Sequence, residues 1–199
     1  MLNFDLLIPT RLVFGRDTHR QIGELVKPLA SRVLIHYGSD RIKRTGLFDT
    51  ITQSLENAGV TYVELGGVVP NPRLSKVLEG VKLCQQEKVE LILCVGGGSV
   101  IDSGKAIAHG AADPNLDIWG VFSRGVPVQK TLPVASILTL PAAGSEMSNS
   151  IVITNEQTMR KYGYKNQINR ARLAVIDPTL FFTLPKNQVA NGVCDMMAH

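Results

Sequence analysis

Two side chains near the end of the chain, Asp195 and His199, are of types that bind a divalent metal ion. They stand at positions i and i+4, so on a helix they lie on one face with Cβ atoms about 5–6 Å apart. A carboxylate and an imidazole both suit iron or zinc. Because a catalytic zinc usually takes three protein ligands and a structural zinc four, this pair predicts only part of a metal site.

A glycine-rich turn inside the chain, Gly96-Gly97-Gly98-Ser99, has the composition of a phosphate-binding loop. An apolar run typical of a buried strand precedes it, and a helical pattern comes after it. Glycine permits positive φ and close approach of a ligand, and the amides at a helix start attract a phosphate. The turn does not match the dinucleotide fingerprint, since Ile101 stands where a third glycine is expected, nor the P-loop. A plain strand-to-helix turn, with Ser99 and Asp102 as a capping box, is the alternative.

Length and composition predict a globular chain. Of its 199 residues, 44% are hydrophobic and 19% are charged, which argues against disorder. No apolar run is long enough to cross a bilayer, and the N-terminus lacks the pattern of a secretion signal. We therefore expect a cytoplasmic protein that has no membrane partner.

The cysteines and the basic residues indicate no further partner class. Cys84, Cys94 and Cys194 form no CxxC pair and are expected to be buried thiols. The net charge of +4 comes from scattered residues, so no nucleic-acid partner is predicted. The densest basic segment, 41–44, is typical of a solvated helix face or, alternatively, of a pocket for one phosphate.

Short apolar runs alternate with helical segments from residue 32 onward, which predicts a parallel sheet covered by helices. Strands are expected at 32–37, 60–65, 89–95, 133–140, 150–155 and 171–177, and helices at 40–59, 71–88 and 99–112. Residues 1–15 are expected to be extended and could form a hairpin at the sheet edge, and residues 156–170 to form a loop or hairpin. A last helix should begin at Pro185 and carry both candidate metal ligands.

Four segments together resemble the iron-containing (group III) alcohol dehydrogenases, in particular the branch of NADPH-dependent butanol dehydrogenases and broad-range aldehyde reductases. They read VVPNPRLSKVLEGVKL, GGGSVIDSGKAIA, TLPAAGSEMS and AVIDPTLFFTLPKNQVANGVCDMMAH, in this order. The resemblance covers essentially the whole chain. It implies an α/β fold: a Rossmann-like parallel-sheet domain of the dehydroquinate synthase-like type at 1–184, and the start of an all-helical metal-binding domain at 185–199.

The same resemblance implies a metal site of one Asp and three His that holds Fe²⁺ or Zn²⁺. Asp195 and His199 match the first two ligands, and the other two would lie downstream. His19, His36 and His109 fall in the α/β part, where ordinary surface or core roles are expected. The chain is thus expected to be an N-terminal fragment of an enzyme that is a homodimer at full length.

The implied reaction is hydride transfer between NADP(H) and a primary alcohol or aldehyde, with the metal polarising the oxygen. Asp102 resembles the family's acidic residue near the nicotinamide ribose and the substrate. Lys105, one turn later, could pair with Asp102 in the site, or form a plain salt bridge on the helix face. A nucleotide-binding module without turnover and a relative of the glycerol dehydrogenases are the alternative functions.

The resemblance also implies a set of cofactor-binding residues. These are Gly38, Ser39, Asp40, Arg41, Asn71, Gly96, Gly97, Gly98, Ser99, Thr139, Leu140, Asn149, Lys161 and Leu180. NAD-preferring relatives carry an acid just after the strand at 32–37, whereas Gly38 and Ser39 leave room for a 2′-phosphate. Arg41 or Lys43 could pair with that phosphate, although Asp40 could restore a preference for NAD. We predict that NADP(H) is preferred over NAD(H).

Overall fold

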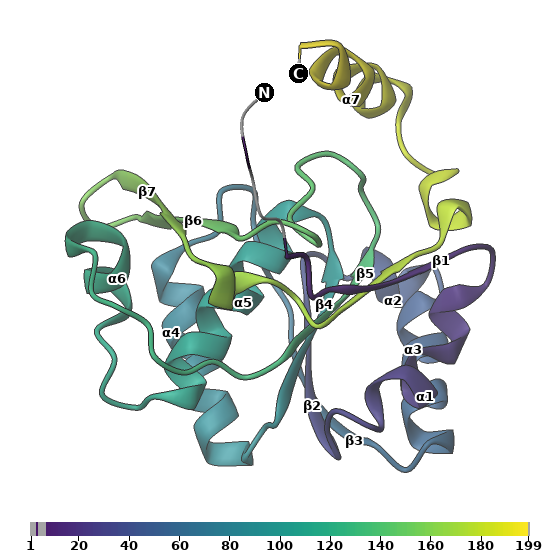
Figure 1. Cartoon of the computed structure of the whole chain (residues 1–199). Coiled ribbons are helices and arrows are strands. Elements are labelled where there is room, and N and C mark those ends of the chain that lie inside the picture. The colour runs from purple at the N-terminus through teal and green to yellow at the C-terminus, as the bar shows by residue number, and fades with distance from the viewer. Residues whose placement is uncertain (1–2, 4–6, 199) are drawn as a thin grey trace.

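A parallel six-stranded sheet lies at the centre of the structure, and helices cover both of its faces (Figure 1). The structure is a computed structural model, and it describes residue 3 and residues 7–198, the side chains of Met196 and Ala198 excepted. The strands are β1 (Arg11–Phe14), β2 (Arg32–Tyr37), β3 (Thr61–Leu65), β4 (Leu91–Gly96), β5 (Val134–Leu138) and β8 (Leu173–Ile176). Their order across the sheet is β1-β8-β5-β4-β2-β3, and every neighbouring pair is parallel.

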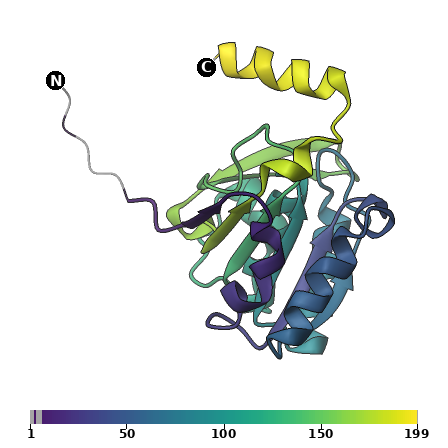
Figure 2. The same ribbon diagram turned by 90° about the vertical axis from the view of Figure 1, so that its right-hand side faces the viewer.

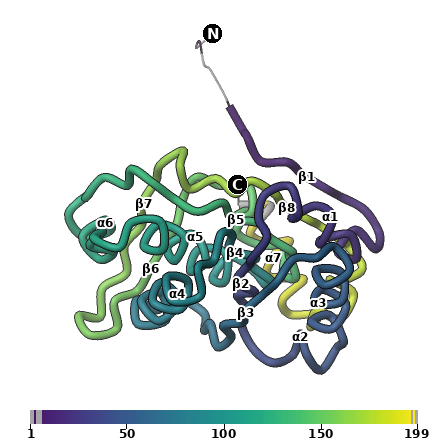
Figure 3. Tube along the Cα trace, turned by 90° about the horizontal axis from the view of Figure 1, so that it is seen from below, coloured from purple at the N-terminus to yellow at the C-terminus, as the bar shows by residue number. Residues whose placement is uncertain are grey.

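Helices lie on each face of the sheet, and a last helix lies beyond its edge. They are α1 (Ile22–Val26), α2 (Arg41–Arg44), α3 (Leu47–Asn57), α4 (Leu74–Glu87), α5 (Gly98–Ala112), α6 (Ile118–Arg124) and α7 (Lys186–Ala198), with short 3₁₀ turns η1 (Thr18–Gln21), η2 (Gln167–Asn169) and η3 (Pro178–Phe181). Residues of α4, α5 and α6 pack on one face, and residues of α1, α2 and α3 on the other. Seen from below, the two layers lie on opposite sides of the strands (Figure 3).

Alternation along the central strands explains why both faces are covered. In β4, Leu91, Leu93 and Val95 belong to one buried cluster. Ile92 and Cys94, which lie between them in the sequence, belong to the other. Successive side chains of a strand point to opposite faces, so a strand that is apolar throughout must be covered on both sides.

Helix α5 lies unusually close to the strand that precedes it. A Cβ atom on Gly104 would lie 2.2 Å from the Sγ atom of Cys94, so only glycine fits at this crossing. The close approach fixes the start of α5 directly after the carboxyl end of β4. The glycine-rich turn is therefore held at the sheet edge where the strands end.

The expected parallel sheet with flanking helices is confirmed, but several local predictions are wrong. Residues 11–14 form an edge strand that pairs parallel with β8, so the N-terminal segment forms no hairpin within the described residues. The expected helix at 40–59 is divided into α2 and α3 by Gly46, whose φ is +75°. Cys194 is exposed, whereas Cys84 and Cys94 are buried as expected.

The strand expected at 150–155 lies outside the main sheet. It is β6 (Ser150–Asn155), which pairs antiparallel with β7 (Arg160–Lys165) as a separate two-stranded sheet. A loop or hairpin is expected at residues 156–170. The observed hairpin is longer, because its first strand is the segment 150–155. It packs against α5 on the buried side, with Ile151 and Ile153 inside the core cluster.

Helix α7 stands beyond the edge of the sheet at which the strands end (Figure 2), and a Cβ atom on its Gly192 would lie 3.7 Å from the Pro141 carbonyl oxygen. Apolar residues Val189, Val193 and Met197 on this helix are exposed. In the described part of the chain, no helix has the length and apolar character that a membrane span requires.

Candidate cofactor site and metal ligands

The turn between β4 and α5 presents free amide groups. Gly97 is the N-cap residue of α5, and no side chain caps the helix. The Gly97 carbonyl accepts hydrogen bonds from the amides of Val100 and Ile101. Among the described residues, the amides of Gly98 and Ser99 have no acceptor. The first turn of a long helix thus points unpaired N–H groups and the positive end of its dipole at one place, which suits an anion.

Lack of room for a Cβ atom, rather than a positive φ, explains why Gly97 and Gly98 of this turn are glycines. None of Gly96, Gly97 and Gly98 has a positive φ. A Cβ atom on Gly97 would lie 3.2 Å from Cβ of Leu140, and one on Gly98 would lie 3.1 Å from Cβ of Ala143. Each distance is tighter than an ordinary contact. The glycines let the chain after β5 approach the turn closely.

Ser99 and Asp102 do not form the capping box that is the alternative for this turn. Asp102 accepts a hydrogen bond from Ser145 Oγ at 2.5 Å through one oxygen and from the Val152 amide at 2.9 Å through the other. The carboxylate therefore joins α5 to the 143–152 segment instead of capping its own helix.

A cavity of about 580 Å³ extends from the glycine turn across the ends of neighbouring strands. Its lining combines residues at the ends of four strands of the sheet with residues from η1, α2, α3 and the start of α7. They are His19, Arg20, Gly38, Ser39, Arg41, Ile42, Thr45, Gly46, Leu47, Thr50, Val95, Gly96, Gly97, Val100, Thr139, Leu140, Thr179, Leu180, Thr183, Leu184, Pro185 and Gln188. The volume lies within the range of small-molecule sites.

The structure brings together about half of the residues that the sequence proposes for the cofactor. Those that line the cavity are Gly38, Ser39, Arg41, Gly96, Gly97, Thr139, Leu140 and Leu180. Those that lie outside the lining are Asp40, Asn71, Gly98, Ser99, Asn149 and Lys161, and the two candidate catalytic residues Asp102 and Lys105 also lie outside it.

Two of the outlying residues meet each other. Lys161 on β7 donates to Oδ1 of Asn71 at 2.7 Å, and Asn71 adopts the left-handed conformation with φ +57°. Asn149 has its backbone carbonyl in hydrogen bonds with the Asn166 amide and with Nδ2 of Asn169. These contacts connect the β6–β7 hairpin to its surroundings.

Lys105 is buried, with 1% of its surface exposed, and does not reach the cavity. Its Nζ donates to the backbone carbonyls of Ser145 at 2.7 Å and Ser148 at 2.9 Å. No ion pair joins it to Asp102 within the part of the chain that the structure describes, so the expected salt bridge is absent there. The ammonium instead holds the 145–150 backbone against α5.

Burial shifts both titrating groups toward their neutral forms. Loss of hydration lowers the pKa of Lys105 to about 8, although the negative charge of Asp102 opposes this shift. Burial also raises the pKa of Asp102, against the hydrogen bonds from Ser145 and Val152. The two groups are thus electrostatically coupled without direct contact.

Two cationic residues proposed to meet a 2′-phosphate are already engaged. Nη2 of Arg41 donates to the backbone carbonyl of Thr183 at 2.8 Å and to its Oγ1 at 2.9 Å. Nζ of Lys43 lies 2.8 Å from a carboxylate oxygen of Glu64, and Lys43 is absent from the cavity lining. Arg41 therefore remains the better candidate, because a guanidinium has five N–H donors and only Nη2 is used here.

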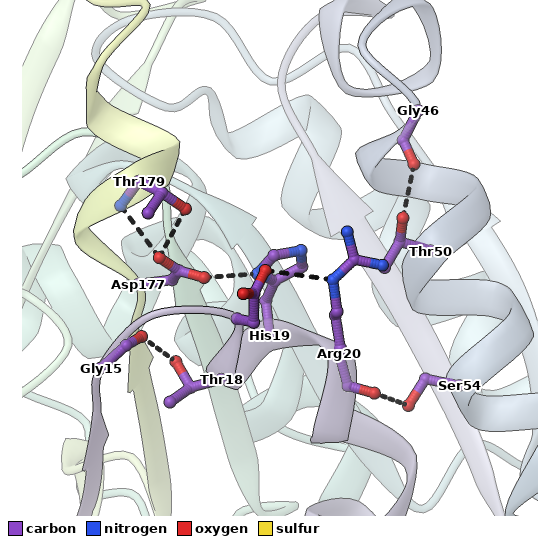
Figure 4. Close-up of polar contacts among 10 residues, drawn as sticks. Gly15, Thr18, His19, Arg20, Gly46, Thr50, Ser54, Asp177 and Thr179 are labelled. Atoms are coloured by element: carbon purple, nitrogen blue, oxygen red, sulfur yellow. Dashed lines mark hydrogen bonds and ion pairs between the residues drawn. The ribbon is translucent and has the colours of Figure 1, made fainter.

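Sequence reasoning misses the cavity residues that come from η1, and of those from η3 it finds Leu180 but not Thr179. An ordinary role is expected for His19, but it lines the cavity while its Nδ1 lies 2.7 Å from Oδ2 of Asp177 (Figure 4). The Asp-Pro pair at 177–178, directly after an expected strand, is the available signal for a capping residue. No local pattern shows that residue 19 faces residue 177, because the parallel pairing of β1 with β8 brings them together.

The other two histidines of the α/β part have the core roles that are expected. His36 and His109 are both buried, and loss of hydration lowers the pKa of each to about 4. His36 contacts Ser103 and the Leu65 carbonyl, and His109 contacts Thr131 and Asn169. Neutral imidazoles therefore connect buried elements.

The proposed metal pair is described only in part. Asp195 lies on α7 and is exposed, and His199 lies outside the described residues. In residues 3 and 7–198, no group of three or more His, Cys, Asp or Glu side chains is placed to hold a metal ion. The chemistry of a carboxylate and an imidazole suits iron or zinc, but two ligands are fewer than a stable site requires.

The fold and the turn together define a doubly wound α/β domain with an anion-accepting turn at the carboxyl edge of its sheet. Residues 9–178 match the family model described as iron-containing alcohol dehydrogenase. The chain therefore belongs to the iron-containing alcohol dehydrogenase family.

Individual relatives agree with this assignment. The chain is 45% identical over 199 residues to the NADH-dependent butanol dehydrogenase A of Clostridium acetobutylicum, and 39% identical over 201 residues to the NADPH-dependent aldehyde reductase YqhD of Escherichia coli; in each case the match covers all of this chain and 51% of the relative. The crystal structure of NADH-dependent butanol dehydrogenase A from Thermotoga maritima superposes with a TM-score of 0.94 at 45% identity, covering 99% of this chain and 50% of that one. The chain thus spans about half the length of these relatives.

Lys105 is expected to make the stability of the fold depend on pH. Its pKa of about 8 in the folded chain returns to 10.5 on unfolding, so between these values the unfolded state binds more protons. The free energy of unfolding should therefore rise as the pH rises from about 8 to 10.5, by roughly 3 kcal/mol at most. Urea unfolding at several pH values in this window measures the change.

The control for this experiment is Lys105→Met, which keeps an unbranched side chain one atom shorter and removes the titrating group. The difference in pH slope between the two proteins isolates the lysine from other titrations. Equal slopes would contradict the burial of a titrating ammonium at this position.

Proposed function

We propose that this chain binds NADP(H) in the cavity at the carboxyl edge of the sheet and belongs to an enzyme that transfers a hydride between this cofactor and a primary alcohol or aldehyde. The single observation that carries the proposal is the uncapped first turn of α5, whose free amides open beside the cavity. Diphosphates bind such turns through N–H groups and the helix dipole. The names of the relatives support the dehydrogenase or reductase class.

In the proposed arrangement each group of cavity residues has a separate task. The turn at 96–99 holds the diphosphate, and Thr139 and Leu140 contact the nucleoside from the neighbouring strand end. Asp102 and Lys105 position the 143–152 segment that closes over the turn, rather than touching the cofactor. The outlying Asn71, Asn149 and Lys161 are proposed to contact the nicotinamide side of the bound cofactor. The hydrogen bond from Lys161 Nζ to Oδ1 of Asn71 joins two of these residues.

The proposed metal site begins on α7, which belongs to a helical domain that starts near residue 185. Asp195 and His199 would supply two ligands for Fe²⁺ or Zn²⁺, and the family name favours iron. When bound, the metal supplies Lewis-acid polarisation of the substrate oxygen. Thr183 and Gln188 line the cofactor cavity from this side, so the same segment that begins the metal domain also contributes to the cofactor pocket.

A preference for NADP(H) is proposed from the residues after β2. Gly38 and Ser39 line the cavity where many dinucleotide-binding sheets place an acid that hydrogen bonds to the ribose 2′-hydroxyl. Here no carboxylate lines the cavity at these two positions, and Arg41 lies two residues beyond Ser39. Relatives of both kinds exist, since the butanol dehydrogenases are named NADH-dependent and YqhD is named NADPH-dependent.

The diphosphate role of the turn is tested by placing a negative charge in it. Gly97→Asp should weaken NADPH binding by about a hundredfold or more, because two like charges about 4 Å apart repel by several kcal/mol. A Cβ atom at residue 97 would lie 3.2 Å from Cβ of Leu140, so both this variant and its neutral control should lose some stability, which the N-cap preference of Asp partly offsets. Isothermal titration calorimetry with NADPH measures the dissociation constant, and thermal unfolding checks the fold.

Gly97→Asn provides the matched neutral change at the same position. It should weaken binding far less than Gly97→Asp, because only the charge distinguishes the two side chains. If both variants bind NADPH equally well, the turn does not hold the diphosphate.

The proposed cofactor preference depends on the absence of a carboxylate after β2. Ser39→Asp should shift the ratio of the NADPH and NADH dissociation constants toward NADH by about tenfold or more, since the new charge repels the 2′-phosphate. Ser39→Asn is the uncharged control and should leave the ratio close to the wild-type value. Tighter binding of NADH than NADPH by the wild-type protein would refute the preference.

A further inference from the structure

His19 of η1 lines the cavity and meets the buried carboxylate of Asp177, the N-cap residue of η3 (Figure 4). The carboxylate of Asp177 is fully buried, and its Oδ1 accepts hydrogen bonds from the Thr179 amide at 2.9 Å and from Thr179 Oγ1 at 2.7 Å. Its Oδ2 meets Nδ1 of His19 at 2.7 Å. Although burial alone would raise the pKa of Asp177, these hydrogen bonds lower it, so the carboxylate is ionised at neutral pH.

The second ring nitrogen of His19 is left for a ligand. The residue is 6% exposed, yet it lines the cavity. Among the described residues, Nε2 of His19 has no hydrogen-bond partner. This atom is not fully buried, so it is accessible from the open space beside the residue. Because the carboxylate of Asp177 accepts the hydrogen bond from Nδ1, the tautomer of the imidazole that carries its proton on Nδ1 has a lone pair on Nε2. Asp177 thereby fixes an acceptor that faces the cavity.

The surroundings of this acceptor suit a flat base. Apolar side chains line the same cavity, among them Ile42, Leu47, Leu140 and Leu180. Gly38 and Ser39, after β2, lie in the same lining, at the position where doubly wound sheets hold the adenosine ribose. A base attached to that ribose would share the cavity with these apolar side chains and with Nε2 of His19.

We propose that His19 is a specificity-determining residue that accepts a hydrogen bond from the exocyclic amino group of an adenine base. This inference rests on the proposed dinucleotide function of the cavity and adds the residue that recognises the base. A lone pair on Nε2 attracts an amino group and repels a carbonyl oxygen, so the site selects adenine against a purine with oxygen at the same position. Asp177 is a positioning residue, because it acts only through the imidazole.

The experiment compares NADPH with its hypoxanthine analogue, which carries oxygen in place of the amino group. In the full chain, the wild type should bind NADPH about tenfold more tightly than the analogue, the effect expected for one hydrogen bond lost to an unpaired acceptor. His19→Asn should reduce this ratio to about twofold or less. The amide nitrogen of Asn is the same number of bonds from Cα as Nδ1, so the contact with Asp177 is retained while the acceptor is removed.

Thr18→Ala is the control for disturbance of η1. Thr18 hydrogen bonds to the Gly15 carbonyl and does not line the cavity, so the variant should lower the melting temperature and leave the binding ratio unchanged. Equal wild-type affinity for the two dinucleotides, preference for the hypoxanthine form, or an unchanged ratio in His19→Asn each overturns the role of His19. Failure to bind either dinucleotide overturns the proposed function as well, so the two failures are distinguishable.

Discussion

The parallel register of β2, β4, β5 and β8 is the constraint on which the candidate site depends. Each strand ends at the same edge, so residues that are far apart in the sequence come together there: Gly38 after β2, Gly97 after β4, Thr139 after β5 and Thr179 after β8. Ligands of open parallel sheets gather at this edge for the same reason. The cavity is therefore a product of topology, and its chemistry comes from the side chains and amides just beyond each strand.

Close packing around α5 keeps that edge in place. Gly104 lets the helix approach β4, Gly97 and Gly98 let the chain after β5 approach the turn, and Lys105 holds the 145–150 backbone from within. The buried ammonium is costly, because it gives up hydration and has only carbonyl dipoles and a distant carboxylate in return. The hydrogen bonds that offset this cost hold the segment over the turn in one arrangement.

The sequence predicts the sheet well because its signals are local. Continuous apolar runs such as 91–95 indicate strands that are buried on both faces, and the glycine turn between such a run and a helical pattern marks the start of α5, where the anion site is proposed. The break at Gly46 is a local feature, which the continuous helical pattern at 40–59 conceals. The separate β6–β7 sheet and the parallel pairing of β1 depend on tertiary contacts that no local pattern shows. The same limit applies to His19, which is placed by a partner 158 positions away. Motif resemblance supplies Asn71 and Lys161 as separate residues, and only the structure shows that they contact each other.

The most direct test of the account is an amide spectrum of the ¹⁵N-labelled chain during titration with NADPH. The free N–H groups at the start of α5 are the proposed contact for the diphosphate, and they lack protein acceptors among the described residues. We expect the resonances of Gly97, Gly98 and Ser99 to shift most, and to shift in the same direction when pyrophosphate alone is added. Saturable binding of NADPH that leaves these three resonances unmoved would contradict the account.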